Sequence, residues 1–129
     1  MQGTNFELVE DFLVAFGQEV RDIPTLADVD TEALRVELIA EEFDELKEAL
    51  ADADLVEVAD ALTDLLYVIY GMGHTYGIDL DSCFLEVHES NMSKLGEDGQ
   101  PIYREDKKVL KGPNYFPPNL AEVLQIDFE

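Results

Sequence analysis

Acidic residues in the middle of the chain occupy positions where an apolar stripe is expected. Leucines recur at helical spacing over residues 30–52, and Glu42 falls on the same side as Leu38 and Leu46 at about 100° of rotation per residue. Glu45 lies at the edge of the same face. A carboxylate buried without a partner is costly, so it takes up a proton, pairs with a cation or binds a metal ion. Glu42 and Glu45 are therefore candidates for chemistry.

A second row of acids lies on the next segment, over residues 54–76. Glu57, Asp60 and Asp64 are spaced i, i+3, i+7, which places them in one row along a helix. The side opposite this row is apolar and carries Val58, Leu62, Leu65, Leu66 and Ile69. The pattern predicts a helix with an acidic stripe in an otherwise apolar circumference, which is typical of a central, buried helix.

Few cations are available to pair with these acids. Arg35 and Lys47 are the only basic residues on the two segments. Four or more carboxylates that converge between two helices favour a hard divalent ion, and oxygen-only ligands favour Mg²⁺ or Mn²⁺ over Zn²⁺. The alternative is that the acids lie on solvated helix faces, since Glu and Asp are seldom buried.

Four long helices are expected to position these residues. Thr4 and Glu7 form a capping box that opens the first helix, which we expect to end near Asp22, before Pro24. The second helix is expected over about residues 30–52. Long helices with short connections indicate an antiparallel bundle.

The third helix is expected over about residues 54–76, where Gly77 stops it. A fourth helix, capped by Asp79 or Asp81, reaches Leu95. Glycines and prolines then interrupt the pattern.

The chain is expected to form one domain over residues 1–129. Its helical core spans about residues 4–95, and an extended C-terminal arm spans about residues 96–129. One last helical turn is expected in the arm near residues 119–125.

The charge balance restricts the possible partners. The chain has 30 acidic and 8 basic residues and a formal net charge of −22. So negative a surface repels nucleic-acid phosphates and anionic lipid, which argues against a nucleic-acid or membrane-surface role. It also repels a nucleotide, so any nucleotide site must bring cations with it.

The remaining composition indicates a protein with a real core, since 47% of its residues are hydrophobic. A chain of this size buries only about two-thirds of its unfolded surface alone, so oligomerisation is expected. Cys83 is the only cysteine and is expected to be buried, which fits a reducing compartment, the cytoplasm. No secretory signal or membrane-spanning stretch is expected.

Two motifs on the acidic segments resemble a known enzyme superfamily. Residues 41–45 (EEFDE) and 60–67 (DALTDLLY) resemble the E-x-x-E and E-x-x-D helices of the all-α nucleoside triphosphate pyrophosphohydrolases. This superfamily includes MazG-like enzymes, dimeric dUTPases and phosphoribosyl-ATP pyrophosphohydrolase. Residues 87–94 (VHESNMSK) are similar to its fourth helix, and residues 108–118 (KVLKGPNYFPP) to the tail of a MazG-like subgroup.

The likeness covers roughly residues 30–120. It implies an all-α, four-helix bundle-like MazG-type fold with an extended C-terminal arm, assembled as a homodimer or homotetramer.

The chain departs from the family pattern at one position. The pattern places Glu at position 61, where this chain has Ala61. Asp60, about one turn before Asp64, takes over the role, or Glu57 with Asp60 is the literal E-x-x-D and Asp64 adds to it. Both alternatives stay open.

The resemblance implies Mg²⁺-dependent hydrolysis of a nucleoside triphosphate, here expected to be a deoxynucleotide, between the α- and β-phosphates. The products are the monophosphate and pyrophosphate, and the biological role is removal of unwanted nucleotides. The implied metal ligands are Glu42, Glu45, Asp60 and Asp64. Mn²⁺ is a possible substitute for Mg²⁺. Glu41 is the implied general base, and Glu57 is an alternate for either role.

The resemblance also implies residues that bind the substrate. Asn91 and Lys94 would contact the phosphates, Lys111 would reach phosphate from the arm, and Tyr115 would stack on the base. The alternative for the arm is a tail that only packs on the bundle.

Two other functions remain to be separated from this one. The first is the phosphoribosyl-ATP pyrophosphohydrolase reaction of histidine synthesis. The second is a non-enzymatic acidic helical module that binds a basic protein. Metal-dependent release of pyrophosphate separates the enzymes from the module, and a substrate panel separates the two enzymes.

Overall fold

The computed structural model describes residues 3–126, which form helices and loops without a regular strand. The helices are α1 (Asn5–Ala15), α2 (Val29–Ala51), α3 (Leu55–Thr75), α4 (Leu80–Met92) and α5 (Leu120–Leu124). The all-helical expectation is confirmed. No helix among the described residues is long and apolar enough to cross a membrane.

The chain packs as two units, the first ending at Leu80 and the second beginning at Asp81. The predicted boundary between core and arm near residue 95 stays a prediction. Residues 1–2 and 127–129, at the two ends of the predicted single domain, lie outside the described residues.

Helix α1 is shorter than the sequence pattern predicted. Its start is as expected, because the Thr4 hydroxyl accepts from the Glu7 amide and the Glu7 carboxylate accepts from the Thr4 amide. Its end near Asp22 was wrong. The chain leaves the helix at Gly17, whose φ of +72° lets the Gln18 amide reach back to the Leu13 carbonyl.

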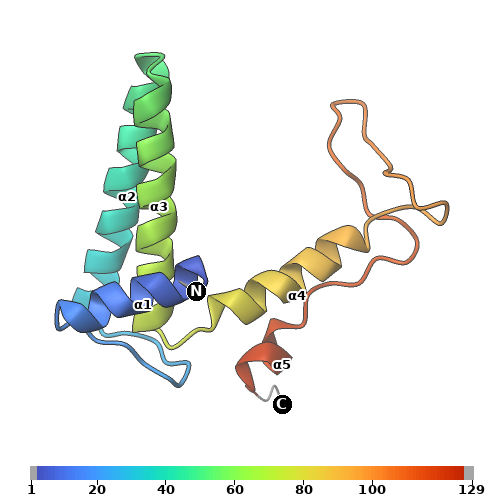
Figure 1. The fold of residues 1–129 in the computed structure, drawn as a ribbon. Coiled ribbons are helices and arrows are strands. Elements are labelled where there is room, and N and C mark those ends of the chain that lie inside the picture. The colour runs from blue at the N-terminus through green and yellow to red at the C-terminus, as the bar shows by residue number, and fades with distance from the viewer. Residues whose placement is uncertain (1–2, 127–129) are drawn as a thin grey trace. The chain divides into compact units, whose positions relative to one another are not determined.

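Helices α2 and α3 form an antiparallel hairpin and lie side by side along their length (Figure 1). Asp28 caps α2 and Asp54 caps α3, each by accepting a backbone amide three residues later. Ala49 and Ala61 are both almost fully buried, which is expected of small residues at a close helix–helix contact.

Helix α1 packs against the C-terminal part of α3. The Phe6 ring stacks on His74 with centroids 3.7 Å apart, and the His74 Nε2 donates to the Phe6 carbonyl at 2.7 Å. At Gly73 a Cβ would lie 2.5 Å from Cδ1 of Leu80, so a bare backbone is required there. These contacts complete the first unit.

In the second unit the chain after α4 folds back onto that helix. The Ser90 hydroxyl donates to the Phe116 carbonyl at 2.8 Å, and the Phe116 amide donates to the Ser93 hydroxyl at 3.1 Å. The Asn119 amide, at the start of α5, donates to Glu86 at 2.9 Å. Cys83 is buried, as expected.

The apolar side of α3 is exposed in the single chain. Leu62, Leu66 and Ile69 retain 47%, 50% and 40% of their accessible surface. The expectation of a central, buried third helix is therefore wrong for one chain alone. Its buried side is instead the row of small residues that faces α1 and α2, such as Ala61 and Gly71.

Candidate metal centre

Three carboxylates converge between α2 and α3. Glu42 and Glu45 are one turn apart on α2, and Asp64 faces them from the antiparallel α3. One carboxylate oxygen from each of the three lies within 4.8 Å of the others. Glu42 and Asp64 are half-buried, and Glu45 is exposed. The sequence placed all three residues on inward-facing rows, and the structure brings them together.

The carboxylates destabilise one another's charged forms. Burial, a hydrogen bond with Glu45 and the nearby charges of Glu45, Asp64 and Asp60 together raise the pKa of Glu42 to about 7. Burial, followed by the charges of Asp60 and Glu45, raises the pKa of Asp64. A bound cation would relieve this repulsion, because it favours the ionised form of each group.

The donor set fits a hard divalent cation. All three groups offer carboxylate oxygens, the ligands that Mg²⁺ and Mn²⁺ prefer. Oε2 of Glu42 is buried and makes no hydrogen bond with any described residue. An unsatisfied buried oxygen beside two further carboxylates is what a metal ligand without its ion is expected to look like.

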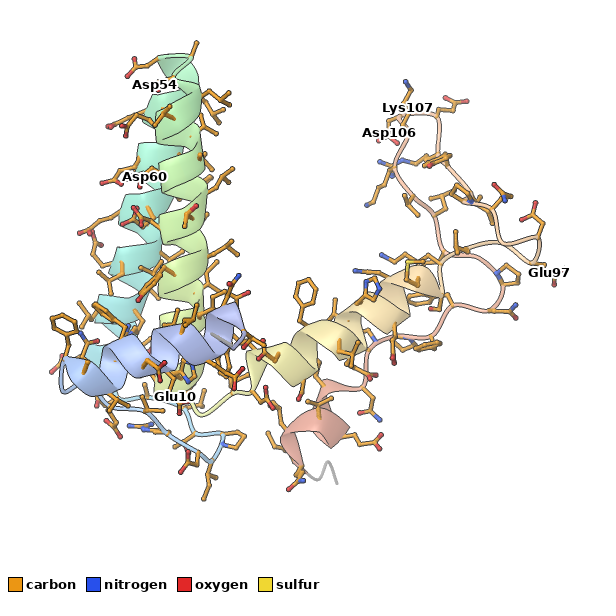
Figure 2. The ribbon with its side chains drawn as sticks, viewed as in Figure 1. Glu10, Asp54, Asp60, Glu97, Asp106 and Lys107 are labelled. Carbon is orange, nitrogen blue, oxygen red and sulfur yellow. The ribbon has the colours of Figure 1, made fainter. Side chains whose placement is uncertain are left out.

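Asp60 and Glu57 lie beside this group rather than within it. Asp60 is exposed and acts on Glu42 and Asp64 through its charge. Figure 2 shows Asp60 part-way along the hairpin, below Asp54 at its tip. Asp60, Glu57 and Glu45 line an acidic hollow of about 400 Å³.

Two other positions named by the resemblance, Ala61 and Glu41, do not contribute a carboxylate to this group. Ala61, which stands where the resemblance implies Glu, is 2% exposed and lines the same hollow. Glu41, the expected general base, is exposed on α2 and is not one of the three converging carboxylates.

The residues expected to bind the substrate belong to the second unit. Nζ of Lys111 lies 4.8 Å from the centre of the Tyr115 ring. The Gly112 amide donates to the Lys94 carbonyl at 2.8 Å, so the arm returns to the end of α4 next to Lys94. Asn91 is exposed near the end of α4. Five of the eight basic residues of the chain lie between positions 94 and 111.

Sequence reasoning missed a polar pair in the first unit. Arg35 is 7% exposed, and its Nη2 donates to Oε1 of Gln18 at 3.0 Å. Arg35 lies seven residues before Glu42, so the spacing that placed Glu42 inward also placed Arg35 inward. Its contact with Gln18 could not be read from the sequence, because Gln18 lies in a loop.

Comparison with known proteins agrees with this geometry. The sequence model of the phosphoribosyl-ATP pyrophosphohydrolase family matches residues 9–91, which include the three converging carboxylates. The chain belongs to this family. The resemblance to the all-α nucleoside triphosphate pyrophosphohydrolases is thereby confirmed, and with it the class of enzyme to which this domain belongs.

One curated relative and one solved structure extend the comparison. The uncharacterized protein L479 of Acanthamoeba polyphaga mimivirus is 32% identical over 129 residues, which are 97% of this chain and 48% of that protein. The chain thus spans about half the length of the curated relative it matches. A protein from Exiguobacterium sp. 255-15, provisionally named an NTP pyrophosphohydrolase, is 31% identical, with a TM-score of 0.53 over 97% of this chain and 96% of that one.

Proposed function

We propose that this protein hydrolyses a nucleoside triphosphate between its α- and β-phosphates in a Mg²⁺-dependent reaction. The products are the nucleoside monophosphate and pyrophosphate, and the proposed role is removal of unwanted nucleotides, deoxynucleotides in particular. The observation that carries this proposal is the convergence of Glu42, Glu45 and Asp64 between two helices of a pyrophosphohydrolase domain.

In the proposed reaction the acids of α2 and α3 hold the cation. Glu42, Glu45 and Asp64 bind it directly, and Asp60 completes the negative environment from the rim. When bound, Mg²⁺ neutralises phosphate charge and lowers the pKa of a coordinated water. Glu41 accepts the proton of the attacking water, with Glu57 as the alternate base.

Basic and polar residues after position 90 are the proposed phosphate contacts. Lys94 and Lys111 contact the phosphates as point charges, and Asn91 donates a hydrogen bond. Tyr115, which already stacks with the Lys111 ammonium, packs against the nucleotide. The net charge of −22 supports a nucleotide as the partner only together with these cations, and argues against nucleic acid.

The same proposal includes a homodimer or homotetramer. Phe43 on α2 and Leu62 and Leu66 on α3 remain about half exposed in the single chain. Leu62 and Leu66 lie one turn apart on α3, and an exposed apolar patch is typical of protein–protein contacts. A second copy is the proposed occupant of this surface.

The Asp64→Asn variant tests the reaction. Incubation with nucleoside triphosphates and Mg²⁺ should release pyrophosphate from the wild-type protein, and Asp64→Asn should lower kcat/KM by about a hundredfold or more. Asp44→Asn is the matched control, because Asp44 lies on α2 but is exposed and pairs with Lys47 at 3.2 Å. Direct release of free phosphate, or full activity in Asp64→Asn, would refute the proposal.

Phosphoribosyl-ATP is a second candidate substrate, because the matching family carries that name. Its hydrolysis also releases pyrophosphate, so the product does not separate the candidates. The two candidates are separated by the ratio of the kcat/KM values for phosphoribosyl-ATP and for simple nucleoside triphosphates.

A further inference from the structure

Arg35 is a buried cation that has no anionic partner among residues 3–126. It is 7% exposed, its Nε makes no hydrogen bond, and none of residues 3–126 forms an ion pair with it. Burial lowers the pKa of the guanidinium, which nonetheless stays protonated in proteins. A buried charge without an opposing one is costly. In a chain with 30 acids and 8 bases, a missing counter-charge at this position calls for an explanation.

Arg35 lines a pocket of about 270 Å³ between α1, α2 and α3. Gln18, Tyr67 and Gly71 are among the other lining residues, and the walls are mostly apolar. A Cβ at Gly71 would lie 3.0 Å from Nη1 of Arg35, so the glycine leaves room for the guanidinium. A mainly apolar pocket with a few placed polar groups is typical of a small-molecule site.

The pocket lies on the same side of the hairpin as the carboxylates. Arg35 precedes Glu42 by seven residues on α2, and Gly71 follows Asp64 by seven residues on α3. Seven residues are about two turns, or about 10 Å along each helix. A nucleotide whose phosphates lie at the carboxylates can therefore extend its base toward Arg35.

Arg35 and Gln18 offer hydrogen-bond donors at this pocket. Arg35 has only donors: its Nη2 binds Gln18, and its buried Nε has no partner among residues 3–126. The side-chain oxygen of Gln18 already accepts from Arg35, so the amide group of Gln18 offers its N–H donors. Such a pocket suits a base edge that carries a carbonyl oxygen, because arginine pairs bidentately with O6 and N7 of guanine. An amino group at the same edge would place donor against donor.

We propose that Arg35 and Gln18 form a base-selecting subsite that prefers oxo bases, namely guanine, hypoxanthine, uracil and thymine, over the amino bases adenine and cytosine. This inference rests on the proposed function, since a nucleotide bound through its phosphates at the carboxylates is the ligand that would bring a base to this pocket. Arg35 and Gln18 are specificity-determining residues in this proposal and take no part in bond cleavage.

Nucleoside binding tests the subsite without metal, phosphate or turnover. Inosine differs from adenosine, and uridine from cytidine, mainly by an oxo group in place of an amino group. We expect inosine and uridine to shift the guanidinium N–H resonances of Arg35 in NMR titrations and to bind at least about tenfold more tightly than adenosine and cytidine. Equal binding within each pair would overturn the inference.

Two variants and one control sharpen this test. Arg35→Met should abolish the discrimination, and it should keep or raise the Tm because it removes an unpaired buried charge. Gln18→Glu should pair with Arg35, raise the Tm and also abolish the discrimination. Arg104→Met is the control, because Arg104 is exposed and pairs with Asp106 in the second unit. Discrimination that survives in both Gln18→Glu and Arg35→Met would contradict the assignment.

Turnover separates this inference from the proposed function. The ratio of kcat/KM values for ITP and ATP should favour ITP by about tenfold or more and fall toward one in Arg35→Met, mainly through KM. Hydrolysis of both substrates without preference would refute the base-selecting subsite and would still support the proposed reaction. Selective nucleoside binding without hydrolysis of any triphosphate would instead refute the proposed reaction. A change in molecular mass in Arg35→Met with unchanged selectivity would assign Arg35 to a subunit contact.

Discussion

At the scale of single residues, the two buried polar atoms without hydrogen bonds among the described side chains are informative. They are Oε2 of Glu42 and Nε of Arg35, which lie on the same helix seven residues apart. The Glu42 oxygen is a hydrogen-bond acceptor surrounded by other carboxylates. The Arg35 nitrogen is a donor with no carboxylate beside it among the described residues. Unsatisfied buried groups are rare in folded proteins, so each points to something that binds there. The sequence predicted the Glu42 site, because acids stand there at positions of an apolar stripe. It did not predict the Arg35 site, because the partner of Arg35, Gln18, lies in a loop.

Glu42 makes the stability of the metal-free protein depend on pH. Its pKa is raised to about 7 from an ordinary value of 4.5, so the folded state holds this proton more tightly than the unfolded state. The stabilising effect of the proton is present below about pH 4.5 and is lost as pH rises toward 7. Glu42→Gln should flatten this decline in Tm in the presence of a chelator, whereas Glu37→Gln, exposed on the same helix, should not. An unchanged profile in Glu42→Gln would show that Glu42 ionises freely.

At the scale of helices, the boundaries that were predictable are those with strong local signals. Helices α2 and α3 lie within one or two residues of expectation, because a capping Asp begins α3 and Gly77 ends it. The end of α1 was misjudged because Pro24 was weighted above Gly17. The acidic rows were predictable from helical periodicity. Which acids meet was not, because hairpin register decides that Asp64 joins the group and Asp60 stays at its rim.

Two glycines of α3 should respond to alanine to different extents. Gly73→Ala places a Cβ 2.8 Å from Cγ of Leu80, so we expect it to lower the free energy of unfolding by about 1–3 kcal/mol. Gly71→Ala places a Cβ 3.0 Å from Nη1 of the buried Arg35, so the gain in helix propensity, up to about 1 kcal/mol, should offset part of the cost and leave a smaller loss than at Gly73. Urea denaturation measures both values. Equal effects of the two substitutions would show that the Leu80 contact does not constrain α3.

At the scale of the whole molecule, net charge and apolar surface oppose each other. A net charge of −22 keeps copies apart, while the exposed leucines of α3 favour association. The sequence predicted the need for association from chain length and composition. It could not show which faces lack a covering, since the apolar side of α3 reads like an ordinary core stripe.

Salt should therefore shift the oligomeric state. Added salt screens the repulsion between copies, so the mass measured by light scattering should rise between low and moderate ionic strength. Leu62→Asp with Leu66→Asp should hold the protein at the smaller mass. Leu26→Asp is the control, because Leu26 is 87% exposed and lies in a loop. A mass that does not respond to the paired α3 substitutions would place the subunit contact elsewhere.

The hydrogen bonds between α4 and the following chain limit how the arm can move. They tie Gly112 to Lys94, Phe116 to Ser90 and Ser93, and Asn119 to Glu86. Because these hydrogen bonds are spread along α4, the arm is not expected to move independently of that helix. Lys94, Lys111 and Tyr115 are therefore held together on one unit, and we expect them to contact a nucleotide as one group.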